Sequence, residues 1–266
     1  MELRQIADFR AEVAELAELL GGLDAADWAR ETGFKRWTVN DIIQHLHMSD
    51  MIAHTAATDA AGFEVLAADI KARRASGVSW VAETRERLGG LEGAALLARW
   101  TERAGALCDA LAAMDPAARL PWFGPGMGVR MFVTARQMET WAHGQAIWDV
   151  MGKERPAPSS RLRNIAEIGV RTFGWTFQNR GMEPPGPVPT VRLATPFGEE
   201  WEWPGGADIV SGDAMAFCQV VTQTRNIADT GLVVQGEVAR RWMALAQCFA
   251  GNPENPPAPG MRARAK

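Results

Sequence analysis

The stretch that most constrains the fold is residues 131–152, MFVTARQMETWAHGQAIWDVMG, whose pattern predicts one helix of about six turns. Five side chains share one face of this helix, because they are spaced 7, 4, 3 and 4 residues apart: Phe132, Glu139, His143, Ala146 and Val150. A carboxylate and an imidazole inside an apolar stripe need partners, because burying an unpaired polar group costs a few kcal/mol. A divalent metal would satisfy both groups at once.

The residues before this stretch predict further helices. Long amphipathic patterns cover 3–20, 38–59 and 91–114, and shorter ones cover 62–74 and 79–88. Thr38 is a plausible N-cap, and Asp41 three residues later completes a near capping box at the start of the second long helix. Four long helices with short connections are typical of a helical bundle. The aromatic loop 121–128 leads into the fourth helix, where Trp122 and Phe123 would either wall a pocket or pack into the core.

The residues after the Pro/Ser-rich segment 153–160 have a different character. One helix is expected over 161–180, followed by a hairpin of 191–195 with 199–203, and by two strands, 207–212 and 231–236, that each precede a helix. The fold class is therefore α+β, an N-terminal four-helix bundle with a smaller C-terminal α+β domain. The expected boundaries are a bundle over 1–155, a connecting helix over 156–182, an α+β domain over 183–255 and a disordered tail over 256–266.

Composition excludes several classes of function. The 266 residues are 47% hydrophobic and 23% charged, as in a globular protein, and the net charge of −4 gives no electrostatic footprint for nucleic acid. No apolar run is long enough to span a membrane, and the charged N-terminal residues do not resemble a signal peptide. Cys108, Cys218 and Cys248 lie far apart in apolar contexts and are interpreted as buried hydrophobes in a reducing compartment. We expect a cytoplasmic monomer or homodimer.

A third metal ligand would have to come from another helix, because an open catalytic zinc site keeps three protein ligands. The remaining histidines, His45, His47 and His54, all lie on the second long helix. His45 is at the edge of its apolar face, which favours it as the partner of Glu139 and His143. The alternative is a separate constellation of His47, Asp50 and His54 on the opposite face, which we expect to be wetter. A further alternative is that Glu139 and His143 form a simple surface pair.

Two stretches resemble a known family. Trp37 with DIIQHL (41–46) is similar to the start of the second helix of DinB/YfiT-like metal-binding bundles. RQMETWAHGQAIWD (136–149) resembles the fourth helix of the N-terminal domain of mycothiol-dependent maleylpyruvate isomerases. The segments 198–203, 211–236 and 239–251 resemble the C-terminal region of actinobacterial-type relatives, a region also described as wyosine-base-formation-like. Asp149 falls one residue away from the acidic position usual in the family, and no role is carried over to it.

The resemblance implies a divalent metal held by His45, Glu139 and His143, with zinc foremost, although nickel and iron also suit imidazole and carboxylate ligands. It implies an enzyme that activates a low-molecular-weight thiol, such as mycothiol or glutathione, for transfer or isomerisation of a small organic substrate. Metal binding lowers the pKa of a thiol, and the thiolate is the nucleophile. Arg225 matches an arginine that reaches the site in the relatives, where it could clamp a carboxylate, although it could equally cap its own helix.

Two other functions stay open on the sequence. In a metal-dependent hydrolase or lyase, water would take the position of the thiol and turnover would need no added thiol. In a non-catalytic binding protein, the metal would have a closed shell of four ligands, with His47 or Asp50 as a further ligand. The sequence names neither the substrate nor the thiol.

Overall fold

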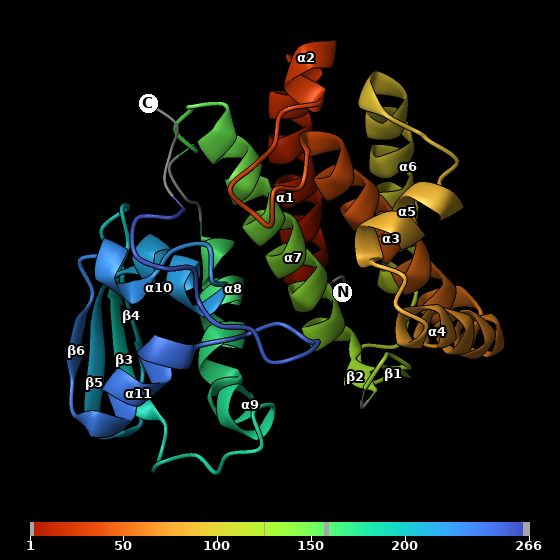
Figure 1. Ribbon diagram of the computed structural model, residues 1–266. Coiled ribbons are helices and arrows are strands. Elements are labelled where there is room, and N and C mark those ends of the chain that lie inside the picture. Colours follow the sequence, from red (N-terminus) through yellow and green to blue (C-terminus); the bar gives the residue numbers. More distant parts are fainter. Residues whose placement is uncertain (1–2, 125, 157–159, 263–266) are drawn as a thin grey trace. The chain divides into compact units, whose positions relative to one another are not determined.

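The computed structural model describes residues 3–124, 126–156 and 160–262, and two compact units divide the chain, Met1–Met151 and Gly152–Lys266. Unit 1 is helical and unit 2 combines helices with a sheet (Figure 1). The α+β fold class with a helical N-terminal region is confirmed. The division lies before the boundary expected at residue 155, and residues 160–182 belong to unit 2. The domain boundaries expected from the sequence stay a prediction.

Unit 1 is a bundle of four long helices (Figure 1). The helices that begin at Arg4 and Val39 each pack against both of the helices that begin at Gly93 and Val129. These helices are α1 (Arg4–Gly21), α3 (Val39–Thr58), α6 (Gly93–Ala112) and α7 (Val129–Val150). The shorter elements are α2 (Ala25–Trp28), α4 (Ala60–Ala75), α5 (Trp80–Arg87) and a two-stranded antiparallel pair, β1 (Arg119–Leu120) with β2 (Met127–Gly128). Both α4 and α5 pack against α3.

The predicted apolar faces form the core of unit 1. The buried residues include Ile6, Phe9, Val13, Leu16 and Leu20 on α1 and Val39, Ile42, Leu46 and Ala53 on α3. The predicted capping box is present at the start of α3, where Asp41 N donates to Thr38 Oγ1 at 3.1 Å and Thr38 N donates to Asp41 Oδ2 at 3.0 Å. Local sequence therefore sets both where α3 begins and which of its faces is inside.

The aromatic loop before α7 belongs to the core. Trp122 stacks on Phe63 with ring centroids 5.9 Å apart and meets Phe132 edge-on at 5.1 Å. Phe123 lies against both Phe63 and Trp122. Packing into the core, rather than forming the wall of a pocket, is the role that these two side chains take. Residue 125 of this loop lies outside the described residues.

Unit 2 is a four-stranded sheet with helices packed on it (Figure 1). The strand order is β4-β3-β5-β6, in which β3 and β4 form the predicted antiparallel hairpin, β5 runs parallel to β3 and β6 antiparallel to β5. The strands are β3 (Pro189–Ala194), β4 (Glu200–Trp203), β5 (Gly206–Asp213) and β6 (Val233–Gln235). The helices are α8 (Leu162–Arg171), α9 (Phe173–Gln178), α10 (Ala214–Val221), the 3-10 turn η1 (Ile227–Asp229) and α11 (Glu237–Leu245).

Two details of unit 2 differ from the expectation. The single helix expected over 161–180 is two helices, α8 and α9, because the backbone departs from helical geometry at Thr172, where φ is −96° and ψ is 14°. Residues 256–262, part of the tail 256–266 that was expected to be disordered, form hydrogen bonds with other residues of unit 2, and residues 263–266 lie outside the described residues. Asn226 donates to the Pro257 carbonyl at 2.8 Å, and other hydrogen bonds hold residues 260 and 262.

A buried charge pair ties three bundle helices together. Asp50 of α3 accepts from Arg136 Nε of α7 at 3.0 Å and from Trp100 Nε1 of α6 at 3.1 Å. All three side chains are almost entirely inaccessible to solvent. Burial raises the pKa of the Asp50 carboxyl, whereas Arg136 and the Trp100 indole act in the opposite direction. The pair connects the helices that carry the histidines and Glu139, so it helps to fix their relative positions.

We predict that Asp50→Ala lowers the free energy of unfolding by about 3–5 kcal/mol, because it leaves the Arg136 guanidinium buried without its counter-ion. Urea denaturation followed by circular dichroism measures this. The matched control is Glu102→Ala, which breaks the exposed pair of Arg99 and Glu102 on α6 and should cost less than about 1 kcal/mol. Equal losses in the two variants would contradict a structural role for the buried pair.

Candidate metal centre

Three potential ligands converge between α3 and α7. His45 comes from α3, and Glu139 and His143 come from successive turns of α7. One ligand atom from each lies within 4.8 Å of the other two. Within residues 3–124, 126–156 and 160–262, no other group of three or more His, Cys, Asp and Glu side chains gathers this closely. The expected neighbours therefore do meet, and their role as metal ligands stays a prediction.

The separations suit a shared ion better than direct hydrogen bonds. Glu139 Oε2 lies 3.3 Å from His143 Nε2 and 3.5 Å from His45 Nε2. A charge-assisted hydrogen bond is usually about 2.7–2.9 Å long, so both contacts are longer than such bonds. Ligand atoms on a tetrahedral ion with bonds of about 2.0–2.1 Å lie roughly 3.4 Å apart. His45 Nε2 is also buried without a hydrogen-bond partner among the described residues. The three residues therefore fit a divalent metal.

The protonation states also suit a metal. Burial raises the pKa of the Glu139 carboxyl, but His143 and His45 outweigh burial and hold that pKa well below its ordinary value. Burial, assisted by the neighbouring His143, lowers the pKa of His45 to about 4. Near neutral pH Glu139 is therefore a carboxylate and His45 a neutral imidazole, which are the forms that bind metals. The Glu139 side chain retains 24% of its exposure, so solvent reaches the site.

Aromatic side chains surround the two histidines. The Trp37 ring is parallel to His143, with centroids 6.1 Å apart, and meets His45 at 5.5 Å. Phe34 meets His143 edge-on at 4.9 Å. From α5, Trp80 lies 5.8 Å from His45, and its indole N–H donates to His45 Nδ1. These rings limit the motion of both imidazoles and exclude water from their sides.

The aromatic pair Phe34 and Trp37 comes from a tight turn with an unusual backbone. Trp37 N donates to the Phe34 carbonyl at 2.9 Å, and the two central residues have positive φ angles, 52° at Lys35 and 58° at Arg36. Both angles lie in the left-handed region, which is disfavoured for residues with a Cβ by roughly 1–2 kcal/mol each. The turn brings the two rings to 5.0 Å from each other beside the histidines. Such strain is often found where a side chain must be aimed at a site.

The alternative constellation of His47, Asp50 and His54 does not form a site. The face that carries them was expected to be wetter, and this is wrong for His47 and Asp50, which are both buried where α3 packs against α6. The reason is that α6 covers the side of α3 opposite to His45. The Asp50 carboxylate accepts hydrogen bonds from Arg136 and Trp100. None of the three residues belongs to the His45, Glu139 and His143 group.

The other residues singled out from the sequence have hydrogen-bond partners of their own. Arg225 belongs to unit 2, where its guanidinium Nη1 donates to the Thr224 carbonyl at 2.8 Å. Asp149, on α7, accepts from Gln145 Nε2 at 3.0 Å. All three cysteines are buried, as the sequence predicted. Burial raises the pKa of the Cys218 thiol well above its ordinary value, so it is no nucleophile.

The sequence did not identify Trp80 or Phe34 as neighbours of the site. Trp80 is the first residue of the short helix α5 and reaches His45 because α5 packs against α3. Phe34 reaches His143 only through the turn before α3. The sequence contains a weak indication that Arg136 lies near the site, because Arg136 is about one turn before Glu139 on the same helix.

Comparisons with known proteins agree on one family. The sequence family described as the mycothiol maleylpyruvate isomerase N-terminal domain matches residues 9–148. Two uncharacterized proteins of Mycobacterium tuberculosis, from strains CDC 1551 / Oshkosh and ATCC 25618 / H37Rv, are each 40% identical over 250 residues. These matches cover 93% of this chain and 96% of each relative.

Solved structures show the same fold. The crystal structure of the mycothiol-dependent maleylpyruvate isomerase matches with a TM-score of 0.52 and 18% identity, over 82% of this chain and 87% of that one. A point mutant of that isomerase matches with the same TM-score and coverage at 17% identity.

No helix in the described parts of the chain is long and apolar enough to cross a membrane.

We predict that the metal-free protein loses stability as the pH falls from 6.5 to about 4. Burial is the main cause that lowers the pKa of both His45 and His47 to about 4, compared with 6.5 in an unfolded chain. In this window the unfolded chain binds protons that the folded protein does not, so acid favours unfolding, by at most about 1.4 kcal/mol per pH unit for each histidine. Urea denaturation at several pH values in the presence of a chelator measures the slope.

The variant His47→Gln should flatten this slope, because it removes one of the two buried histidines. The more exposed His54 provides the control, and His54→Gln should change the slope less. A slope that is the same in wild type and His47→Gln would contradict the assignment.

Proposed function

The chain belongs to the mycothiol maleylpyruvate isomerase family, and from this premise we propose that it is a metal-dependent enzyme in which His45, Glu139 and His143 hold a divalent ion. The reaction class that we propose is a transfer or isomerisation of a small organic substrate, with a low-molecular-weight thiol as cosubstrate. Mycothiol is the first candidate, because the solved isomerase with the same fold is described as mycothiol-dependent. Glutathione is the second.

The observation that carries the proposal is the spacing of three ligand atoms in a site that solvent reaches. Both imidazoles face the same oxygen of Glu139, at 3.3 Å and 3.5 Å, and one imidazole nitrogen has no hydrogen-bond partner in the described structure. A structural metal site is usually closed by four protein ligands. A group of three ligands leaves room for an exogenous one, which favours catalysis over a structural role.

Zinc is the ion that we propose first, because two imidazoles with one carboxylate form a common catalytic zinc set. Nickel and iron suit the same ligands. When bound, the metal supplies Lewis acidity, which lowers the pKa of a coordinating thiol so that a thiolate exists at neutral pH. All three cysteines are buried, and we therefore propose that this thiol comes from solution.

The side chains of the protein supply the surroundings of the reaction. Glu139 contributes a negative charge that offsets part of the charge of a divalent ion. Phe34 and Trp37 exclude water beside the two imidazoles, which strengthens electrostatic interactions there. Half-exposed rings of this kind also offer an apolar surface to a small organic substrate.

Arg225 is proposed to bind a carboxylate of the substrate. The proposal rests on the match of its position to an arginine of the isomerase relatives and on the geometry of a guanidinium, which can bind a carboxylate through two parallel hydrogen bonds. Arg225→Lys, which keeps the charge but loses the bidentate geometry, would then raise KM for a carboxylate substrate.

We predict that purified wild-type protein carries about one divalent ion per chain and that Glu139→Ala and His143→Ala each lose most of it, because a site of three ligands binds poorly with two. Inductively coupled plasma mass spectrometry identifies and quantifies the metal. His54→Ala is the control, since His54 lies on α3 outside the group and should leave the metal content unchanged. Unchanged metal in both ligand variants would refute the site.

We also predict that a thiol binds directly to the metal. In protein reconstituted with Co²⁺, mycothiol or glutathione should produce the near-ultraviolet charge-transfer absorption of a cobalt–thiolate bond, and the S-methylated thiol should not. No new absorption with either thiol, together with turnover that needs no thiol, would support a hydrolase or lyase that uses water instead.

A further inference from the structure

The hydrogen bond between Trp80 and His45 determines where the proton of the His45 imidazole lies. Trp80 Nε1–H donates to His45 Nδ1. An indole N–H can only donate, so Nδ1 must accept through its lone pair. A neutral imidazole has one N–H, and in this arrangement it is on Nε2, which faces Glu139 Oε2 at 3.5 Å. The Trp80 indole therefore selects one of the two tautomers of His45.

This tautomer is incompatible with a metal on His45. If the metal binds Nε2, the proton must move to Nδ1, where it would face the N–H of Trp80. If the metal binds Nδ1, it takes the same lone pair that now accepts from Trp80. A ring without either proton is an imidazolate, which is not an ordinary state near neutral pH. Metal binding through either nitrogen thus breaks the hydrogen bond to Trp80.

We propose that Trp80 is a gate on the metal centre, whose indole N–H competes with the metal for His45 and turns away when the metal binds. The inference rests on the proposed metal site and adds a residue that regulates its occupancy. Trp80 acts through His45, so it is a positioning residue and not a ligand. In the metal-free protein it holds His45 in a hydrogen-bonded tautomer, which satisfies a buried nitrogen.

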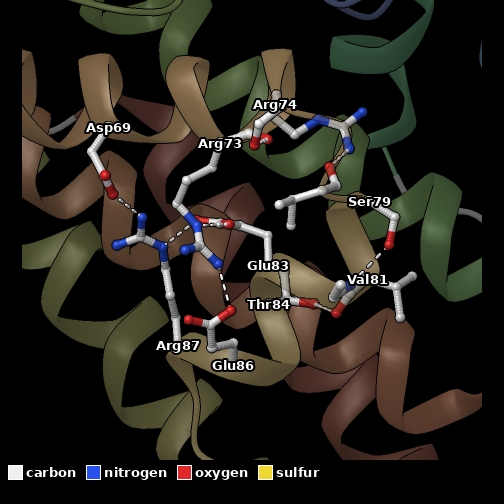
Figure 2. Close-up of polar contacts among 12 residues, drawn as sticks. Asp69, Arg73, Arg74, Ser79, Val81, Glu83, Thr84, Glu86 and Arg87 are labelled. Atoms are coloured by element: carbon white, nitrogen blue, oxygen red, sulfur yellow. Dashed lines mark hydrogen bonds and ion pairs between the residues drawn. The ribbon is translucent and has the colours of Figure 1, made fainter.

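The fold allows the indole to move while its helix stays in place. Trp80 is the first residue of α5, and the rest of α5 is anchored independently of it. Figure 2 shows the anchor on one side, where the fully buried Glu83 binds both Arg73 of α4 and Arg87. On the other side, Arg85 Nε and Nη2 bind Asp41 of α3 at 2.8 and 2.9 Å. These ion pairs hold α5 against α3 and α4 whether or not Trp80 contacts His45.

Opening the gate costs one hydrogen bond and part of the packing of the indole. Trp80 is partly exposed, so its N–H can donate to water after the side chain turns. The net value of the lost hydrogen bond is modest because water replaces it. The partly buried ring also packs against the bundle core, and some of this packing is lost when it turns. The competition should therefore weaken metal binding by a factor of about 2 to 10, and not abolish it.

The test is the affinity of metal-free protein for Zn²⁺, measured by competition with a chromophoric chelator at pH 7. Trp80→Phe keeps an aromatic ring but removes the N–H, so it should bind Zn²⁺ about 2- to 10-fold more tightly than wild type. The matched control is Trp37→Phe, which removes another indole beside the same two histidines and should not tighten binding. A Trp80→Phe affinity equal to or weaker than that of wild type overturns the gate.

A second measurement uses the wild-type protein and does not depend on the variant folding. The chain has four histidines, so their ¹⁵N resonances can be resolved by labelling. Without metal, His45 should carry its proton on Nε2. Addition of Zn²⁺ should remove that proton or move it to Nδ1, and shift the Trp80 indole N–H. An Nδ1–H tautomer in the metal-free protein, or an unperturbed Trp80 N–H in the zinc-bound one, overturns the gate.

The experiments distinguish failure of the gate from failure of the metal centre. If wild type binds Zn²⁺ and Glu139→Ala does not, but Trp80→Phe binds no more tightly than wild type, the metal centre stands and the gate is refuted. If wild type itself binds no divalent ion, both the proposed function and the gate are refuted.

Discussion

The arrangement of unit 1 depends on a carboxylate held between two imidazoles inside a helical bundle. Glu139 would be expensive to bury alone, and its contacts with His45 and His143 offset that cost. Because His45 belongs to α3 and the other two to α7, the group can form only when these helices pack at one register. Behind it, the Asp50 and Arg136 pair joins the same two helices. Two sets of buried charges therefore hold the geometry of the site.

The surroundings of the site come from segments that contribute little to the core. Phe34 and Trp37 are presented by a turn with two left-handed residues, and Trp80 by a short helix anchored through ion pairs. A rigid pair of long helices carries the ligands, while shorter peripheral segments supply the groups that contact them. This division is common in functional sites, since loops and short elements can change their conformation without unfolding the scaffold.

Much of this organisation could be predicted from the sequence, because its causes are local. The helical repeat places Glu139 and His143 one turn apart, and Thr38 with Asp41 starts α3 in the right place. The prediction of a wetter face for His47 and Asp50 was wrong, because helical phase shows which residues share a face but not that α6 would cover it. The single helix expected over 161–180 missed the break at Thr172, where the backbone departs from helical geometry.

The sequence by itself determined the long helices, their inward faces, the hairpin of unit 2 and the position of Glu139 and His143 on one helix face, since each depends on spacing along one segment. Only the tertiary structure decided that His45 meets Glu139, that Asp50 belongs to Arg136 and Trp100, and that the Trp80 indole occupies His45 Nδ1. These contacts join residues between 35 and 94 positions apart, as the separations from 45 to 80 and from 45 to 139 show. The pattern within one helix carries no information on which distant helix packs beside it, and that packing sets the chemistry of the site.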